Sequence, residues 1–146
     1  MKQFTLIFIL ISSFVFSQTS EEELIKSTVN GLFDGMKTSD SSKITKAFSK
    51  TAVLQTITKN SEVKNESVKN FTAIISKAEK GSLDERISFS NILIDGNLAS
   101  VWTPYEFYYQ GKFSHCGVNS FQLVKANNEW KIQCIIDTRR KDNCKK

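Results

Sequence analysis

The first half of the chain carries the hydrophobic spacing of helices. In "EEELIKSTVNGLFDGMK" apolar residues recur every three or four positions, which predicts an amphipathic helix over residues 21–37. Ser20 is a suitable N-cap, and the three glutamates favour the first turn. The same spacing predicts a short second helix in "SDSSKITKAFS", capped by Asp40, and a third in "NESVKNFTAIISKAEKG", with Gly81 as its C-cap. Between these two, "AVLQTIT" alternates as a strand, and "SEVKN" is expected to pair with it.

The second half changes to the alternation of β-strands. From residue 86 onward, four runs follow one another: "ERISFSNILI", "NLASVWTPYEFYY", "KFSHCGVNSFQLVKA" and "EWKIQCIIDTRR". They are separated by the turn-forming pairs Asp95-Gly96, Gln110-Gly111 and Asn127-Asn128. This pattern predicts an antiparallel meander of four strands, preceded by one or two earlier strands. Since the three helices can cover one face of such a sheet, the expected fold class is α+β.

The three predicted turns fix a register, and the register decides which side chains share a face of the sheet. On this register Glu106 lies opposite His115, and Trp102 lies opposite Asn119. The third turn places Leu123 opposite Ile132, Phe121 opposite Cys134 and His115 opposite Arg140. One face then collects most of the large apolar residues, and the helices are expected to cover it. Its members are Ile87, Phe89, Leu93, Leu98, Trp102, Phe121, Leu123, Trp130, Ile132 and Ile136.

Polar residues gather at one end of this predicted covered face and suggest a binding pocket. His115 is the only histidine of the chain. Trp102 and Phe121 would supply apolar walls, while Glu106, His115 and Asn119 would orient a ligand. The candidate ligand-binding residues are Trp102, Glu106, Tyr108, His115, Asn119, Phe121 and Arg140. The alternative interpretation is that Glu106, His115 and Arg140 satisfy one another and only stitch the sheet together.

The opposite face of the predicted sheet mixes apolar and polar side chains. Its apolar members are Ile92, Val101, Tyr105, Phe107, Val118 and Ile135. An open sheet face of this composition is typical of a subunit interface, so the sequence predicts a homodimer through this face.

The first 17 residues have the pattern of a signal peptide. "MKQFTLIFILISSFVFSQ" begins with a lysine and continues as an apolar run that is short for a bilayer-spanning helix. Val15 and Ser17 occupy the −3 and −1 positions of a small-residue cleavage site. We therefore expect residues 1–17 to be removed, residues 18–146 to form one exported domain, periplasmic or secreted, and no membrane segment to remain after cleavage.

Charge and residue counts remove several classes of function. The net charge is +5, or +4 without Lys2, and much of the excess lies in the basic tail "RRKDNCKK". No basic stripe with interleaved aromatics appears, which argues against a nucleic-acid partner. One histidine, and cysteine spacings that match no zinc motif, argue against a metal site. No cofactor is expected.

The three cysteines are an odd number for an exported protein, so at least one is free or pairs between chains. On the predicted register Cys134 lies on the covered face as a small apolar residue. Cys116 lies on the other face, opposite Arg139, and five further residues allow Cys144 to fold back toward it. We therefore expect any intramolecular disulfide to join Cys116 to Cys144, with Cys134 free.

The order of elements resembles the nuclear transport factor two-like fold, a cone in which a curved sheet wraps a long helix, and the resemblance covers residues 21–140. The end of the chain is similar to a secreted bacterial branch known as putative lumazine-binding proteins. The motif positions are Trp102, Tyr105, Gly111, His115, Cys116, Gly117, Trp130, Lys131, Ile132, Asp137, Thr138, Arg139 and Cys144. The Phe-Ser-Gln at the end of the leader is similar to signal peptides of Bacteroidetes-type bacteria.

The resemblance implies a domain that binds an unidentified small molecule. Enzymes of this fold, such as ketosteroid isomerases, polyketide cyclases and scytalone dehydratase, use Tyr/Asp, Asp/His or paired-His sites. None of these sets carries over to this chain, where Asp34 is the one acid expected near the cavity from the first helix.

Two alternatives to a binding domain stay open. In one, the protein is a small isomerase, dehydratase or cyclase in which Glu106 orients His115 as a general base. In the other, it is a non-catalytic dimeric interaction module with a filled cavity.

Overall fold

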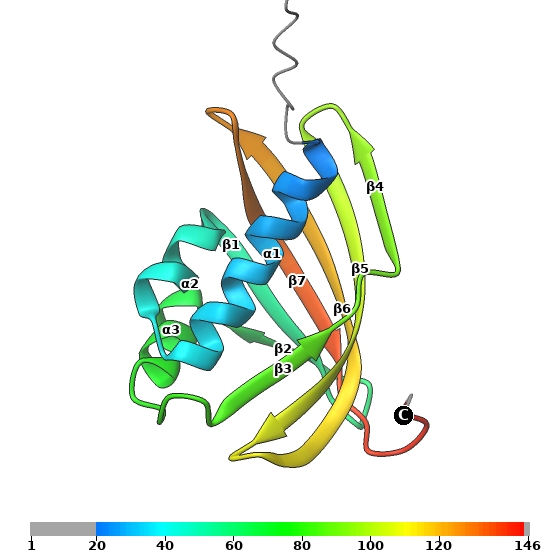
Figure 1. Ribbon diagram of the computed structural model, residues 1–146. Helices are drawn as coiled ribbons and strands as arrows, with labels where there is room; N and C mark the ends of the chain where they lie inside the picture. The colour runs from blue at the N-terminus through cyan, green and yellow to red at the C-terminus, as the bar shows by residue number, and fades with distance from the viewer. Residues whose placement is uncertain (1–19, 145–146) are drawn as a thin grey trace, which may run out of the picture.

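The computed structural model describes residues 20–144 and consists of three helices packed against one strongly curved, seven-stranded mixed sheet (Figure 1). Helix α1 lies along the face of the sheet that curves toward it, while α2 and α3 stand beside one end of the sheet. This is the α+β cone that the sequence predicts. The elements follow in the order α1 (Glu21–Thr38), α2 (Ser41–Ala47), β1 (Phe48–Ile57), β2 (Val63–Glu66), α3 (Val68–Ile75), β3 (Leu83–Ile87), β4 (Asn91–Asp95), β5 (Leu98–Tyr109), β6 (Lys112–Ala126) and β7 (Glu129–Thr138).

The first two helices begin where the sequence predicts. The Ser20 side chain accepts a hydrogen bond from the backbone N–H of Glu23 and so caps α1. Asp40 caps α2 through the backbone N–H groups of Ser42 and Lys43. The apolar stripe of α1 packs into the core, where its buried members are Ile25, Val29, Leu32, Phe33 and Met36.

Helix α3 is shorter than predicted, because it ends at Ile75 and not near Gly81. Beyond it, the chain bends back toward the end of α1. Ser39 donates its hydroxyl proton to the carbonyl of Ala78, and the N–H of Gly81, at a φ of +82°, donates to the carbonyl of Lys37. These contacts with α1 replace the last helical turns. Within α3 itself, Ile74 is 63% exposed.

The last strand of the chain lies inside the sheet. The strand order is β2-β1-β7-β6-β5-β3, and β4 pairs separately with β5 beyond the end of β3. The pairing of β1 with β7 is parallel, and all other strand pairs are antiparallel. The early strand β1 is therefore joined to the meander through the final strand.

Two of the three predicted turns are confirmed, and the first is displaced. Tyr109 pairs with Lys112 around Gln110-Gly111, and Ala126 pairs with Glu129 around Asn127-Asn128. The earlier hairpin closes with Asp95 opposite Leu98, so its turn is Gly96-Asn97 and not Asp95-Gly96. The single strand expected over residues 85–94 is also divided into β3 and β4, both of which pair with β5.

A β-bulge at Ser114 overturns the predicted register between β5 and β6. Tyr108 lies opposite Phe113, but Phe107 lies opposite His115, so Ser114 is an extra residue on β6. Because neighbouring side chains alternate between the two faces, one extra residue moves the rest of β5 to the opposite face relative to β6. The prediction that Glu106 faces His115 is therefore wrong. Glu106 lies opposite Cys116.

The same shift moves Trp102, which lies opposite Ser120 and not opposite Asn119. A second bulge, at Gln133 on β7, has a comparable effect. Leu123 pairs with Ile132 as predicted, but beyond the bulge the partner of Phe121 is Ile135 instead of Cys134. The predicted pairing of His115 with Arg140 is replaced by an isolated bridge between Cys116 and Arg140.

The bulges exchange part of the predicted faces. Phe121, Leu123, Trp130 and Ile132 are buried under the helices as predicted, and Ile87 and Phe89 pack against the same core. Leu93, Leu98 and Trp102, predicted to be covered, are instead 67%, 48% and 48% exposed, and Ile136 alternates with the inward-facing Ile135. The residues that move from the predicted open face to the covered side are Ile92, Val101, Tyr105, Phe107 and Ile135. Val118 keeps its predicted place on the open face, next to the buried Asn119.

No helix within residues 20–144 is long and apolar enough to cross a membrane. The predicted leader, residues 1–17, lies outside the described residues.

Candidate functional site

A cavity of about 530 Å³ lies between the helices and the covered face of the sheet. Helix α1 contributes Leu32, Phe33 and Met36 to its wall, and α3 contributes Phe71, Ile74 and Ile75. The strands supply the remaining lining: Leu54, Gln55, Thr56, Lys64, Asn65, Glu66, Leu83, Glu85, Tyr105, Phe107, His115, Asn119, Phe121, Ile135, Asp137 and Arg139.

The wall of the cavity is mainly aromatic and aliphatic. Phe33 of α1 meets Phe121 of β6 edge to face, with ring centroids 6.1 Å apart. Phe71 and Phe107 contribute two further rings from α3 and β5. Such a surface, with a few polar groups at one end, is the usual composition of a pocket for a small organic molecule.

Asp137 is the centre of the polar end of the cavity. Thr56 donates its hydroxyl proton to Oδ1 at 2.5 Å, and Arg139 donates Nε–H to Oδ2 at 2.9 Å. The Tyr105 hydroxyl donates to the carbonyl of Thr138 at 2.9 Å and lies 3.4 Å from Asp137 Oδ2. Burial and the nearby Asp137 raise the pKa of Tyr105, which keeps its hydroxyl protonated. The Asp137 carboxylate is therefore bound on both oxygens and holds β1, β5 and β7 together.

Glu85 lies in the same wall with fewer partners. Its Oε1 accepts a hydrogen bond from Asn119 Nδ2 at 2.8 Å, the one hydrogen bond found for this carboxylate within residues 20–144. Burial is the main cause that raises the pKa of Glu85 to about 7, and the Asp137 charge adds to it. The Asn119 hydrogen bond and Arg139 lower the pKa and offset part of this effect. Glu85 is thus an acid that exchanges its proton close to neutral pH.

We expect Glu85→Gln to remove a pH dependence of stability. Since the ordinary glutamate pKa is 4.5 and that of folded Glu85 is about 7, the folded protein binds more protons than the unfolded chain between these values. The difference in the free energy of unfolding between wild type and the variant then favours wild type most below pH 4.5. This advantage is lost as the pH rises to 7. Because solvent that reaches the cavity screens the charge, the free energy of unfolding changes by roughly 2 kcal/mol over this range.

Urea unfolding of both proteins at several pH values measures this difference. Glu106→Gln, on the other face of the sheet, is the matched control and should keep the wild-type profile. Parallel curves for wild type and Glu85→Gln from pH 4 to pH 8 would contradict the assignment.

His115 faces the cavity and is held by aromatic neighbours. Its ring centroid lies 5.7 Å from that of Tyr105 and 5.0 Å from that of Phe107. Nδ1 is 3.0 Å from the hydroxyl of Ser114, the bulged residue. Burial, and then the positive charge of Arg139, lower the pKa of His115, so the imidazole is uncharged at neutral pH.

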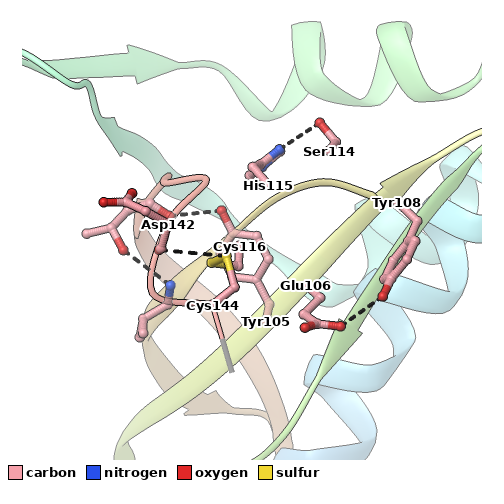
Figure 2. The surroundings of a disulfide bond; sticks show 10 residues. Tyr105, Glu106, Tyr108, Ser114, His115, Cys116, Asp142 and Cys144 are labelled. Atoms are coloured by element: carbon pink, nitrogen blue, oxygen red, sulfur yellow. Dashed lines mark hydrogen bonds between the residues drawn. A yellow bond between two sulfur atoms is a disulfide. The ribbon is translucent and has the colours of Figure 1, made fainter. Parts of the chain in front are cut away.

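Figure 2 shows Glu106 turned away from His115 and toward Tyr108. The Tyr108 hydroxyl donates to Glu106 Oε2 at 2.9 Å, and the Arg86 guanidinium lies 4.0 Å from the centre of the Tyr108 ring. The predicted pair of Glu106 and His115 therefore does not form.

The structure brings three of the seven candidate site residues into the cavity wall, namely His115, Asn119 and Phe121. Trp102, Glu106, Tyr108 and Arg140 are not part of that wall. Asp34, the acid expected near the cavity from α1, also lies outside it and faces the outer side of the helix. The polar residues that line the cavity without having been predicted are Gln55, Thr56, Lys64, Asn65, Glu66, Glu85, Tyr105, Asp137 and Arg139. The sequence did contain one signal for them, the Asp-Thr-Arg motif at residues 137–139.

A disulfide joins Cys116 to Cys144, the pairing that the sequence predicts (Figure 2). It attaches the C-terminal tail, residues 139–144, to the side of β6 that faces away from the cavity. Backbone hydrogen bonds of 2.9 Å in both directions between Cys116 and Arg140 strengthen the attachment. Arg139 is therefore fixed at the polar end of the cavity. Cys134 is the free cysteine, but it precedes the inward-facing Ile135 and does not lie on the covered face as predicted.

Comparison of the sequence with profiles of known protein families shows to which family the chain belongs. The sequence profile of the family described as "Putative lumazine-binding" matches residues 20–134. The protein belongs to this family. The match covers all three helices and the sheet as far as the middle of β7, so the lining residues Ile135, Asp137 and Arg139 follow its end. No curated protein matches this family member significantly.

Solved structures show the same fold at low sequence identity. An NTF2-like protein of unknown function from Shewanella baltica has a TM-score of 0.68 at 18% identity, over 84% of this chain and 98% of its own. An NTF-2-like protein of unknown function from Silicibacter pomeroyi has a TM-score of 0.67 at 17% identity, over 84% and 100%. A cystatin-like domain of unknown function from Nostoc punctiforme has a TM-score of 0.66 at 15% identity, over 85% and 80%. The family member described here therefore has the NTF2-like, cystatin-like cone fold.

Proposed function

We propose that this protein binds a small, mainly apolar organic molecule in the cavity between α1, α3 and the sheet. The observation that carries the proposal is the 530 Å³ cavity itself, which has an aromatic wall and one polar end. A domain that served only as an interaction module would be expected to fill this space with its own side chains. The membership of the putative lumazine-binding family supports the same conclusion.

Filling the cavity should abolish binding. We expect Ile135→Trp, which places an indole inside the cavity, to weaken binding of the neutral fluorescent probe N-phenyl-1-naphthylamine at least tenfold, because the added volume displaces the probe. The adjacent Ile136 points to the other face of β7, so Ile136→Trp is the matched control and should bind the probe as wild type does. Fluorescence titration measures both affinities. An equal loss of probe affinity in the two variants, or no binding of the probe by the wild type, would refute the proposal.

A second candidate function is proton transfer to or from a bound substrate. The observation that favours it is Glu85, a cavity carboxyl whose pKa of about 7 suits a general acid or base at neutral pH. The enzyme considered as an alternative from the sequence, with Glu106 orienting His115, does not form, because these residues lie on opposite faces of the sheet. Turnover that Glu85→Gln abolishes without loss of binding would favour the enzyme.

The proposal includes export of the domain after removal of residues 1–17. The apolar leader, and the small residues Val15 and Ser17 before Gln18, support this part of it. N-terminal sequencing of protein recovered from the cell envelope or the medium should give Gln18, or a blocked pyroglutamate at that position. An intact Met1 would contradict export.

We further propose a homodimer through the open face of the sheet, which is the side away from α1. The apolar residues of this face are Leu93, Leu98, Trp102, Pro104, Val118 and Ile136. Nearly half of the Trp102 side chain and two thirds of Leu93 are exposed in the monomer. A patch of large apolar side chains on an open sheet face is typical of a protein interface.

Trp102→Asp is expected to convert the dimer to a monomer, because it places a charge at the centre of the apolar open face. Sedimentation velocity at 10–100 μM, roughly the range in which weak interfaces dissociate, measures the change. Ile74→Asp is the control, since Ile74 is even more exposed than Trp102 but lies on α3. A wild-type protein that sediments as a monomer throughout this range would rule out the dimer.

A further inference from the structure

The wall of the cavity carries more negative than positive charge when Glu85 is ionised. Three carboxylates line the cavity, those of Glu66, Glu85 and Asp137, against the two cations Lys64 and Arg139. His115 adds no charge at neutral pH, because burial and Arg139 lower its pKa. An anionic ligand would therefore meet a wall of net negative charge when Glu85 is ionised.

Arg139, one of the two cations, already holds Asp137. Its Nε–H donates to Asp137 at 2.9 Å, and its Nη2 donates to Thr56 at 3.2 Å. The charge of Arg139 is therefore balanced by Asp137 within the protein. By contrast, Glu85 receives its one hydrogen bond among the described residues, from Asn119, on Oε1. Its Oε2 accepts no hydrogen bond from these residues and can accept one from a ligand.

The aromatic wall also favours a positive charge. Tyr105, Phe107 and Phe121 line the cavity on the same side as Glu85, on the neighbouring strands β5 and β6. The faces of such rings attract cations, and this attraction grows when water is excluded. A ligand that carries an ammonium group next to an apolar ring would satisfy both features of the site.

We propose that the cavity selects an organic cation, a protonated amine or amidine attached to an apolar ring, whose N–H groups donate to the carboxylate of Glu85. This assignment rests on the proposed binding function and adds the chemical class of the ligand. The apolar ring lies among Phe33, Phe71 and Phe121, and the cationic group reaches the strand side of the cavity.

Three probes of similar size and different charge test the assignment. They are 1-naphthylmethylamine, 1-methylnaphthalene and 1-naphthoate, each measured at pH 8 by displacement of N-phenyl-1-naphthylamine. The expected result is that the amine binds at least tenfold more tightly than the naphthoate and more tightly than the neutral hydrocarbon. Glu85→Gln should reduce the amine-to-naphthoate ratio at least fivefold. The amide oxygen introduced by Glu85→Gln can still accept the hydrogen bond from Asn119, so this local contact is preserved. Glu106→Gln, with its glutamine on the opposite face, should keep the wild-type ratio.

The outcomes separate the two proposals. If the hydrocarbon displaces the reporter and the amine shows no preference over the naphthoate, the cation assignment fails while the binding function stands. A preference for the amine that survives Glu85→Gln also overturns the assignment, because another group then supplies the selectivity. If neither the reporter nor any of the three probes binds, the proposed function fails, and the assignment fails with it.

Discussion

Replacement of Gly117 by alanine is expected to lower the free energy of unfolding by about 3 kcal/mol, at the upper end of what overpacking costs. A Cβ atom at this position would lie 1.8 Å from the carbonyl oxygen of Thr138 and 2.8 Å from Cε1 of Tyr105. The first contact is with backbone, which cannot rotate away as a side chain can. The chain after β7 would have to move off β6.

The movement would also disturb the cavity. The same Thr138 carbonyl accepts the Tyr105 hydroxyl at 2.9 Å, and the next residue is Arg139. The Gly117→Ala variant should therefore bind N-phenyl-1-naphthylamine more weakly than wild type, in addition to unfolding at lower urea concentration. Both effects follow from one methyl group on the covered face of β6.

Gly31→Ala is the matched control for this substitution. Gly31 lies in α1, and a Cβ there would meet nothing within 4 Å. Alanine at a helical glycine should stabilise the protein by about 0.5–1 kcal/mol. Urea unfolding of the two variants should thus give changes of opposite sign. A Gly117→Ala variant as stable as wild type would mean that the chain after β7 does not cross β6 as closely as described.

The double variant Cys116→Ser/Cys144→Ser is expected to lose about 3–4 kcal/mol of stability. The disulfide closes a loop with a sequence separation of 28 residues, and the chain-entropy estimate for a loop of this length falls in that range. The loss comes mainly from greater freedom of the unfolded chain. In the folded protein, the same change releases the tail that holds Arg139.

Reduction of the wild type provides the comparison for the double variant. Dithiothreitol should lower the stability of the wild type to that of the double variant and should leave the double variant unchanged. Cys134→Ser is the control, since Cys134 is the free cysteine and is only partly buried. It should change stability by less than about 1 kcal/mol. Peptide mapping that finds Cys134 in the bridge would contradict the pairing.

Local signals in the sequence predict most of the elements of this fold. Ser20 and Asp40 cap helices because their side chains accept from backbone N–H groups close by in the sequence. Gln110, Asn127 and Asn128 all have positive φ values in the structure, as the turns predicted at these positions require. These features depend on a few neighbouring residues, so a single sequence contains them.

The two bulges are the unpredicted features of the fold with the largest effect on the site. Ser114 and Gln133 carry no residue type that marks an extra position in a strand, and their bulging depends on the curvature of the complete sheet. The consequence extends well beyond each bulge. One extra residue at Ser114 moved Trp102 and Glu106 out of the predicted site and brought Tyr105 and Phe107 into the cavity wall.

Glu85 shows a second limit of the sequence. It stands in β3 between Asp84 and Arg86, which form an ion pair with each other outside the cavity. Nothing in this run of three charged residues marks the central one as facing a cavity. Its environment comes from Asn119 and Asp137, which are distant in the sequence. Asp137 and Arg139, in contrast, stand in the Asp-Thr-Arg motif, and a site prediction built on that motif would have included them.

The position of β7 determines when the protein can fold. This strand ends at Thr138, close to the end of the chain, yet it lies between β1 and β6 and pairs with β1 across about 80 residues of sequence. A nascent chain that lacks β7 has no strand pairing that joins β1 and β2 to the meander, and long-range pairing of this kind forms slowly. Synthesis must therefore be nearly complete before the sheet can close. A chain with this order of pairing cannot complete its sheet while it is being made, and an incomplete sheet leaves the polypeptide closer to the unfolded state that a translocation channel accepts.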